Sequence, residues 1–224
     1  TYGLNVQADV RATDITHNGF TSSYKVKYFG NEIGEITLKI PGKHNINNSL
    51  VAVVIGKELG VDFKIIKSAL ESFSGVYRRF EVKYNKEILV IDDYAHHPTE
   101  ATATLKAIRD GWDRRLVAVF QPHLYSRTRD FYQEFGRAFL NSDLFICTDV
   151  YPARELPIEG VTGDLIASTT KKFGHKNVHY IADKKDVPVL LNEIKKDGDI
   201  IVTMGAGDIW KFGEQFVGML NKNR

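Results

Sequence analysis

Residues 87–111 read EILVIDDYAHHPTEATATLKAIRDG, and this stretch decides the fold. An apolar run ends in acids and histidines, and Pro98 then opens a segment whose apolar residues have helical spacing. The same order of apolar run and amphipathic segment recurs, with runs that begin at Arg115, Asp143, Asn177 and Asp199. Near-continuous apolar strands that alternate with helices predict an α/β fold with a doubly wound, mostly parallel sheet.

The earlier part of the chain has a different texture. Residues 5–40 alternate between apolar and polar side chains, and the Asn18-Gly19 dipeptide between two alternating runs predicts an antiparallel hairpin. A helix is predicted next, with Asn45 or Asn47 as its N-cap. Asp62 is the predicted N-cap of a second helix. This part should therefore fold as an antiparallel sheet with helices.

Composition limits the class of protein. The 224 residues are 43% hydrophobic and 26% charged, as in soluble globular domains, and the change of texture predicts two domains, residues 1–77 and 78–224. The net charge of +2 gives no sign of a nucleic-acid partner, and no apolar run approaches the roughly 18 residues of a membrane span. We therefore expect a cytoplasmic protein without a membrane partner. Cys147 lies in an apolar run and is predicted to be a core residue.

Titratable side chains gather where the predicted strands end. In an open α/β sheet ligands bind outside the carboxyl ends of the strands, so these residues should share one edge. The candidates there are Asp92, Asp93, Tyr94, His96, His97, His123, Arg127 and Arg129. Each also has a simpler explanation, because an acid can cap the next helix and adjacent histidines can form a surface pair.

A second group of polar residues lies in the earlier part of the chain. Asn45 and Asn48 are three residues apart and share a helix face. Amides there can read a base or a ribose, although the spacing alone favours simple helix capping. Arg78 and Arg79 lie at the domain boundary, where an arginine can clamp phosphate, although a surface salt bridge is the simpler explanation. A metal site of His96, His97, His123 and Asp93 is disfavoured, because adjacent strand residues point to opposite sides.

Several long strings carry a resemblance to a known family. GKHNINN, GVYRRFE, IDDYAHHPTE, FQPHLYSRTRDF, DVYPARELPIEGV and MGAGDI occur in this order, and over essentially its whole length the chain resembles the Mur ligases. It is most similar to the members that join L-alanine to the carboxylate of UDP-N-acetylmuramate in peptidoglycan precursor synthesis. The resemblance implies that residues 1–77 end the central ATPase domain and that residues 78–224 form the Rossmann-like C-terminal domain. It also implies ATP and Mg²⁺, which activate the carboxylate as an acyl phosphate.

The resemblance assigns roles to individual residues. It implies that the nucleotide is bound by His44, Asn45, Asn48, Arg79 and Asp93. It implies that the amino acid is bound by Tyr94, His96, His97, His123, Arg127 and Arg129. Catalysis would involve Asp93, His96, His123 and Arg127. Some relatives carry an arginine where this chain has Leu124, which leaves the carboxylate clamp to Arg127, alone or with Arg129.

One expected motif does not occur in the sequence. No G-x-x-x-x-G-K-[ST] phosphate loop is present, and the residues that would bind Mg²⁺ and the UDP-sugar are expected outside these 224 residues. The chain begins with Thr1, and we expect it to be part of a longer protein and inactive alone. Two alternatives stay open, a peptide-recycling ligase of the same family and a non-catalytic ligand-binding module.

Overall fold

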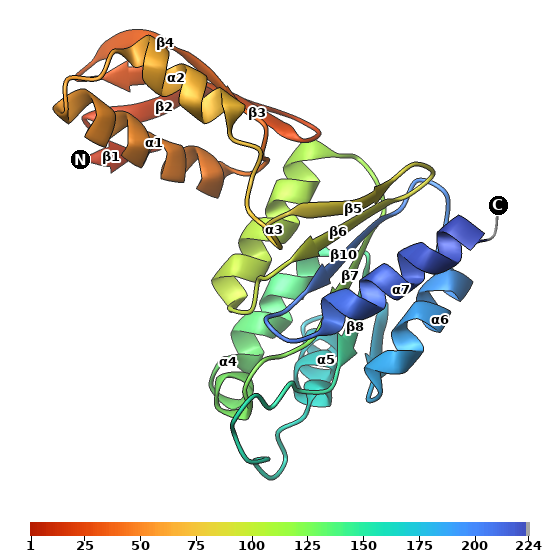
Figure 1. The fold of residues 1–224 in the computed structure, drawn as a ribbon. Helices are drawn as coiled ribbons and strands as arrows, with labels where there is room; N and C mark the ends of the chain where they lie inside the picture. Colours follow the sequence, from red (N-terminus) through yellow and green to blue (C-terminus); the bar gives the residue numbers. More distant parts are fainter. Residues whose placement is uncertain (223–224) are drawn as a thin grey trace. The chain divides into compact units, whose positions relative to one another are not determined.

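The computed structural model describes residues 1–222 (Figure 1). Its internal contacts divide the chain into two compact units. The first unit comprises residues 1–75 with residues 106–112, and the second comprises residues 76–105 with residues 113–224. Within the described residues, no helix is long and apolar enough to cross a membrane.

The first unit contains a four-stranded sheet in the order β1-β2-β3-β4. Its strands are β1 (Tyr2–Gly3), β2 (Val10–Asn18), β3 (Thr21–Tyr28) and β4 (Asn31–Leu38). β2, β3 and β4 pair antiparallel, and the hairpin predicted at Asn18-Gly19 is confirmed, with Gly19 at a φ of 54°. Buried residues of β3 and β4, such as Tyr24 and Ile36, form a core with Leu50 of the following helix.

Two helices follow the sheet, α1 (Lys43–Glu58) and α2 (Phe63–Ser72). The Asp62 carboxylate accepts a 2.7 Å hydrogen bond from the Lys64 amide, so the predicted cap of α2 is confirmed. The predicted start of α1 is wrong. Its N-cap is Gly42, with a φ of 101°, and Asn45 and Asn47 therefore lie inside the helix. Glycine tolerates this backbone conformation, which is why the helix begins without a capping side chain.

The second unit contains a six-stranded sheet in the order β5-β6-β10-β7-β8-β9. Its strands are β5 (Glu81–Asn85), β6 (Leu89–Asp93), β7 (Leu116–Phe120), β8 (Leu144–Thr148), β9 (Val178–Ile181) and β10 (Ile200–Met204). The five apolar runs form β6 to β10 and pair in parallel, which confirms the predicted α/β fold. The antiparallel edge strand β5 was not predicted, because its short alternating sequence resembles a surface segment.

Helices cover both faces of this sheet (Figure 1). They are α3 (Pro98–Gly111), α4 (Tyr125–Ala138), α5 (Gly163–Lys172), α6 (Val187–Ile194) and α7 (Ile209–Lys222). A helix that connects two parallel strands of one sheet forms a right-handed crossover. The connections from β6 to β7, β8 and β9 run in one direction across the sheet, so α3, α4 and α5 lie on one face. The connection from β9 back to β10 runs in the opposite direction and places α6 on the other face. α6 and α7 pack against Val90, Val119 and Ile201. Cys147 is buried in β8, as predicted.

The strand order determines where a ligand can bind. β10 lies between β6 and β7, and the helix that follows it covers the opposite face from the helices that follow its neighbours. The connections therefore diverge at the carboxyl end of β10. Open α/β sheets bind ligands at such points.

Candidate active site at the carboxyl edge of the sheet

The segments that follow β7, β8 and β10 are tied together at this edge. The Leu124 amide donates to the Tyr151 carbonyl at 3.0 Å, and the Tyr151 amide donates to the Pro122 carbonyl at 2.8 Å. The buried Gln121 side chain accepts from the amides of Asp208 and Ile209 at 3.0 and 3.1 Å. Backbone and side-chain bonds thus fix three loops that leave different strands.

Four rings form a row along this edge. The ring centroids of Tyr94 and His96 are 5.2 Å apart, and those of His96 and His123 are 6.1 Å apart. The His123 ring in turn stacks on Tyr151 at 5.7 Å with an interplanar angle of 12°. The structure therefore brings together three residues proposed from the sequence and adds Tyr151, which the sequence analysis did not select. We call these four residues the aromatic row.

The two adjacent histidines separate at the start of α3. The amides of His96 and His97 both donate to the Glu100 carboxylate, at 2.9 and 3.2 Å, so Glu100 caps this helix rather than Asp92 or Asp93. His96 Nδ1 lies 3.0 Å from the Tyr94 carbonyl. The His97 ring packs on Phe131 instead, at 5.0 Å. Of the histidine pair, only His96 joins the aromatic row.

The two arginines at the domain boundary also differ. The buried Arg78 has a φ of 56°, and its guanidinium donates to the Asp92 carboxylate and to the Gly205 carbonyl, each at 2.7 Å. It also lies 5.0 Å from the Tyr94 ring centroid. Burial raises the pKa of Asp92, and the bond from Arg78 acts against that shift. The buried Arg78 guanidinium therefore packs beneath Tyr94, which is the first residue of the aromatic row.

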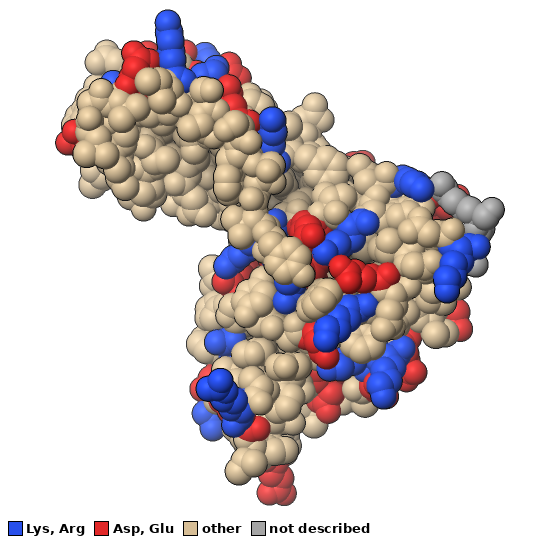
Figure 2. Space-filling view, in the orientation of Figure 1, with Lys and Arg blue, Asp and Glu red and all other residues tan. Residues whose placement is uncertain are grey.

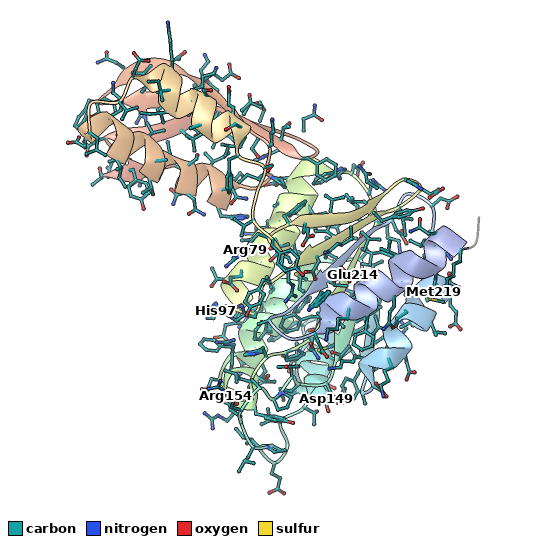
Figure 3. All side chains as sticks on the ribbon, in the orientation of Figure 1. Arg79, His97, Asp149, Arg154, Glu214 and Met219 are labelled. Atoms are coloured by element: carbon teal, nitrogen blue, oxygen red, sulfur yellow. The ribbon has the colours of Figure 1, made fainter. Side chains whose placement is uncertain are left out.

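Arg79 and Asp93, both proposed to contact nucleotide, have different environments. The Arg79 side chain (Figure 3) is 56% exposed, and its guanidinium lies 3.9 Å from the Glu100 carboxylate. Asp93 is buried, and its two oxygens accept from the amides of Ala95 at 2.8 Å and Phe80 at 3.0 Å. Burial raises its pKa against these hydrogen bonds. Asp93 thus holds the backbone after β6, and its nucleotide contact stays a prediction.

His123 and Arg127 have unused polar atoms. Within residues 1–222, the buried side-chain nitrogens and oxygens without a hydrogen-bond partner are Thr13 Oγ1, His17 Nε2, His123 Nδ1 and a terminal nitrogen of Arg127. In the second unit both such atoms therefore lie at the carboxyl edge. Burial lowers the pKa of His123, and Arg127 and His96 lower it further against a smaller opposing effect of Glu155, which favours the neutral imidazole. Buried polar atoms without a partner are costly, so each needs an explanation, and a bound polar ligand is one.

The remaining candidates at this edge are not part of the row. Arg129 is exposed and donates to its neighbour Asp130 at 2.7 Å, so it does not join Arg127. The Gly205–Gly207 turn is explained by close packing. A Cβ on Gly205 would lie 2.6 Å from the Gln121 carbonyl, and one on Gly207 would lie 2.3 Å from the Gln121 side-chain oxygen. Acidic and basic side chains are mixed over the face of this unit in Figure 2.

The candidates of the first unit lie at the start of α1. His44 and Asn48 are exposed, and the Asn45 amide nitrogen donates to the Pro41 carbonyl at 2.7 Å. This bond leaves the Asn45 side-chain oxygen as an acceptor. Among the described residues, no group of three or more His, Cys, Asp or Glu side chains is placed to hold a metal ion.

Family models match most of the chain. Residues 78–207 match the model described as "Mur ligase, glutamate ligase domain", and residues 1–56 match "Mur ligase middle domain". The chain belongs to the Mur ligase family. The family resemblance seen in the sequence motifs is thereby confirmed.

Relatives with curated names support the assignment to the Mur ligases. The chain is 51% identical to the UDP-N-acetylmuramate–L-alanine ligase of Geotalea uraniireducens over 218 residues. The aligned region covers 97% of this chain and 48% of that protein. It is 48% identical to the ligase of the same name from Salinibacter ruber, over 100% of the chain and 47% of that protein. The chain thus spans about half the length of the curated relatives it matches.

Solved structures of Mur ligases share the fold. The UDP-N-acetylmuramate–alanine ligase of Thermotoga maritima matches with a TM-score of 0.84 at 26% identity, over 100% of this chain and 48% of that one. A murein peptide ligase from Psychrobacter arcticus matches with a TM-score of 0.64 at 26% identity, over 98% and 45%.

Proposed function

We propose that this chain is the amino-acid-binding part of an ATP-dependent ligase that joins L-alanine to the carboxylate of UDP-N-acetylmuramate. The observation that carries the proposal is that His123, whose ring lies 6.1 Å from that of His96, and Arg127 each have a buried polar atom without a partner at this edge. The names of the curated relatives support the choice of L-alanine and of the UDP-sugar. Residues 1–77 would end the ATP-binding domain, and residues 78–224 would form the amino-acid domain.

Arg127 and His96, the latter a member of the aromatic row, suit the binding and attack of an amino acid. The Arg127 guanidinium can bind the alanine carboxylate, which needs a donor fork of this kind. Both groups near His96 Nδ1, the Tyr94 carbonyl at 3.0 Å and the Glu100 carboxylate at 3.2 Å, are acceptors, so Nδ1 carries the proton. Nε2 is then free to accept a proton as the neutral amine attacks the activated carboxyl carbon and phosphate leaves. The product is an amide.

The nucleotide part of the proposal involves other residues. His44, Asn45 and Asn48 would contact the base and ribose, and Arg79 would bind the phosphates with its solvent-facing guanidinium. ATP supplies the activation of the carboxylate, with Mg²⁺ on its phosphates. The proposal assigns no magnesium ligand to the described residues, because no suitable cluster is present among them.

A chimera tests this function. Residues 1–224 replace the segment of the G. uraniireducens ligase that they match, and phosphate release is measured with ATP, UDP-N-acetylmuramate and L-alanine. We expect alanine-dependent release by the chimera and none by the 224-residue chain alone, whose sequence lacks a phosphate loop. A folded chimera that binds L-alanine without turnover would instead favour a ligand-binding module. Preferential use of a tripeptide over L-alanine would favour a peptide-recycling ligase.

A further inference from the structure

The loop between β8 and α5 has firmly fixed ends. The Asp149 carboxylate accepts from the amides of Val150 and Gly163, each at 2.9 Å, and so ties the first residue of the loop to the first residue of α5 (Figure 3). Gly163 has no room for a side chain, since a Cβ there would lie 1.9 Å from the Thr148 carbonyl. The loop therefore leaves and rejoins the fold at one point and extends along the carboxyl edge.

Tyr151 is held in place from several directions. Its backbone forms an isolated parallel bridge with His123, and its ring stacks on the His123 imidazole. The Lys184 ammonium lies 5.5 Å from the ring centroid, and a Cβ on Gly207 would approach the ring to 2.8 Å. The ring therefore has little freedom to move, and it restricts the orientation of the imidazole beside it.

Glu155 fastens the same loop to α4. The N-cap of α4 is Leu124, which has a φ of 73° and no side-chain group that can accept a hydrogen bond. The Glu155 carboxylate takes this role, accepting from the Ser126 amide at 2.9 Å and from its hydroxyl at 2.5 Å. These bonds lower the pKa of Glu155, so it is ionised at neutral pH. The first turn of α4 also carries Arg127, so the fastening joins the loop to the proposed carboxylate clamp.

We propose that Tyr151 is a positioning residue that holds the His123 imidazole in one orientation beside Arg127, and that Glu155 keeps Tyr151 there by fastening its loop to α4. The role in amino-acid binding rests on the proposed function. The positioning itself does not, because it concerns contacts within this chain. Besides Tyr151, the charged or titratable groups that face His123 are Arg127 from α4, His96 from the segment after β6, and Glu155 from the loop.

The first test is a histidine titration of the 224-residue chain by NMR. Tyr151→Phe keeps the ring and should leave the His123 midpoint below the ordinary 6.5. Tyr151→Leu removes the stacked ring and should move the midpoint up toward that value, because cover from solvent is the largest cause of the shift. His175, bonded to the Ser142 carbonyl at 2.9 Å, serves as a control for folding and should not change. An unchanged His123 midpoint in Tyr151→Leu with an intact His175 signal would overturn the proposal.

A second variant tests the fastening without touching either ring. Glu155→Ala should weaken the nuclear Overhauser effect between the Tyr151 and His123 rings and speed hydrogen exchange of the Ser126 amide. An Overhauser effect of wild-type strength would overturn the role of Glu155. If Tyr151→Leu fails to fold, the Glu155→Ala variant alone tests whether the loop positions Tyr151 beside His123.

Kinetics of the chimera then connect positioning to chemistry. Tyr151→Leu should lower kcat by on the order of tenfold, while the KM for L-alanine changes little. Tyr151→Phe, which keeps the ring, should have a kcat close to that of the wild-type chimera. A chimera without ligase activity would contradict the proposed function but leave the NMR result standing. Equal kcat in the Leu and Phe variants would overturn the catalytic role of the positioning.

Discussion

The two edges of the parallel sheet carry similar residues with opposite degrees of pairing. At the amino-terminal edge, the Asp199 carboxylate accepts from Arg115 at 3.0 Å and from the Lys196 amide at 2.8 Å. His175 is likewise bonded through both ring nitrogens, to the Ser142 carbonyl at 2.9 Å and the Asn177 amide at 3.1 Å. At this edge the acid, the arginine and the histidine form hydrogen bonds within the protein and so stabilise the fold.

The carboxyl edge is built from the same residue types but is not complete. His123 Nδ1, in the segment after β7, and one nitrogen of Arg127, in the first turn of α4, are buried without a partner. Among the described residues of the second unit, buried polar side-chain atoms without a hydrogen-bond partner are therefore found at the carboxyl edge. Since such groups reduce stability, the difference supports the amino-acid site proposed above.

The sharpest test at the amino-terminal edge is Asp199→Ala. Asp199 is 1% exposed, and its loss leaves the Lys196 amide without this acceptor. Arg115 loses its carboxylate partner and keeps the bond to the Ile194 carbonyl at 3.2 Å. We expect the free energy of unfolding to fall by about 3 kcal/mol, below the upper range for buried pairs because Arg115 is partly exposed. Urea unfolding followed by circular dichroism measures this, with Asp199→Asn as the milder control. A loss of unfolding free energy below about 0.5 kcal/mol would contradict the claim that the pairs at the amino-terminal edge stabilise the fold.

Arg127→Ala makes the matching change at the carboxyl edge. We expect alanine-dependent kcat/KM of the chimera to fall on the order of 100-fold, because a carboxylate clamp is removed. Unfolding free energy should change by less than about 0.5 kcal/mol, since one nitrogen of this side chain has no partner to lose. Arg129→Ala is the matched control on the same helix and should change kcat/KM less than about twofold, because that side chain is exposed and paired with Asp130. Similar losses in both variants would show that the clamp is shared.

Gly207→Ala tests the packing that supports the row. The added Cβ would meet the Gln121 oxygen at 2.3 Å and the Tyr151 ring at 2.8 Å, so unfolding free energy should fall by about 1–3 kcal/mol. The control is Gly218→Ala in α7, where a Cβ has open space and the helix should gain about 0.5–1 kcal/mol. Thermal unfolding of the two variants should therefore shift in opposite directions, and a shift of both in one direction would refute this account.

The smallest expected effect is a dependence of stability on pH. Burial is the main cause that lowers the pKa of His123 at the carboxyl edge and of His175 at the amino-terminal edge below 6.5. The unfolded chain therefore binds protons that the folded chain does not, and stability should decrease as the pH falls through about 6.5. Unfolding at about pH 7.5 and about pH 5.5 measures the loss. His175→Gln should reduce it, and an increase of stability on acidification would contradict these assignments.

Much of the α/β unit could be predicted because its strands are buried on both faces. Five-residue runs such as Leu116–Phe120 are apolar throughout, and their spacing with helices admits few other folds. Because parallel strands share one carboxyl edge, the meeting of Tyr94, His96 and His123 also followed from their positions in the sequence. The edge strand Glu81–Asn85 alternates polar and apolar residues, has one buried side chain, and gave no such signal.

The supporting contacts of the site could not be predicted, since they join distant parts of the chain. The sequence does not show which of the adjacent Arg78 and Arg79 side chains is buried. The positive φ of Arg78 directs its side chain inward, and two neighbouring arginines give no sign of this angle. Tyr151 and Glu155 lie in a polar loop, and their partners His123 and Ser126 are nearly thirty residues away. The string YPARELPIEG pointed to this loop through the family resemblance, but only the structure shows what its residues touch.

One measurement tests the central claim most directly, an NMR-monitored titration of the 224-residue chain with L-alanine. The account predicts saturable shifts of the His123 and Arg127 side-chain signals at one edge and none for His175 and Arg115 at the other. Acetate and methylamine, each carrying half of the ligand's polar groups, should bind more weakly. Absence of saturable shifts at His123 and Arg127, or equal shifts at both edges, would contradict an amino-acid site at the carboxyl edge.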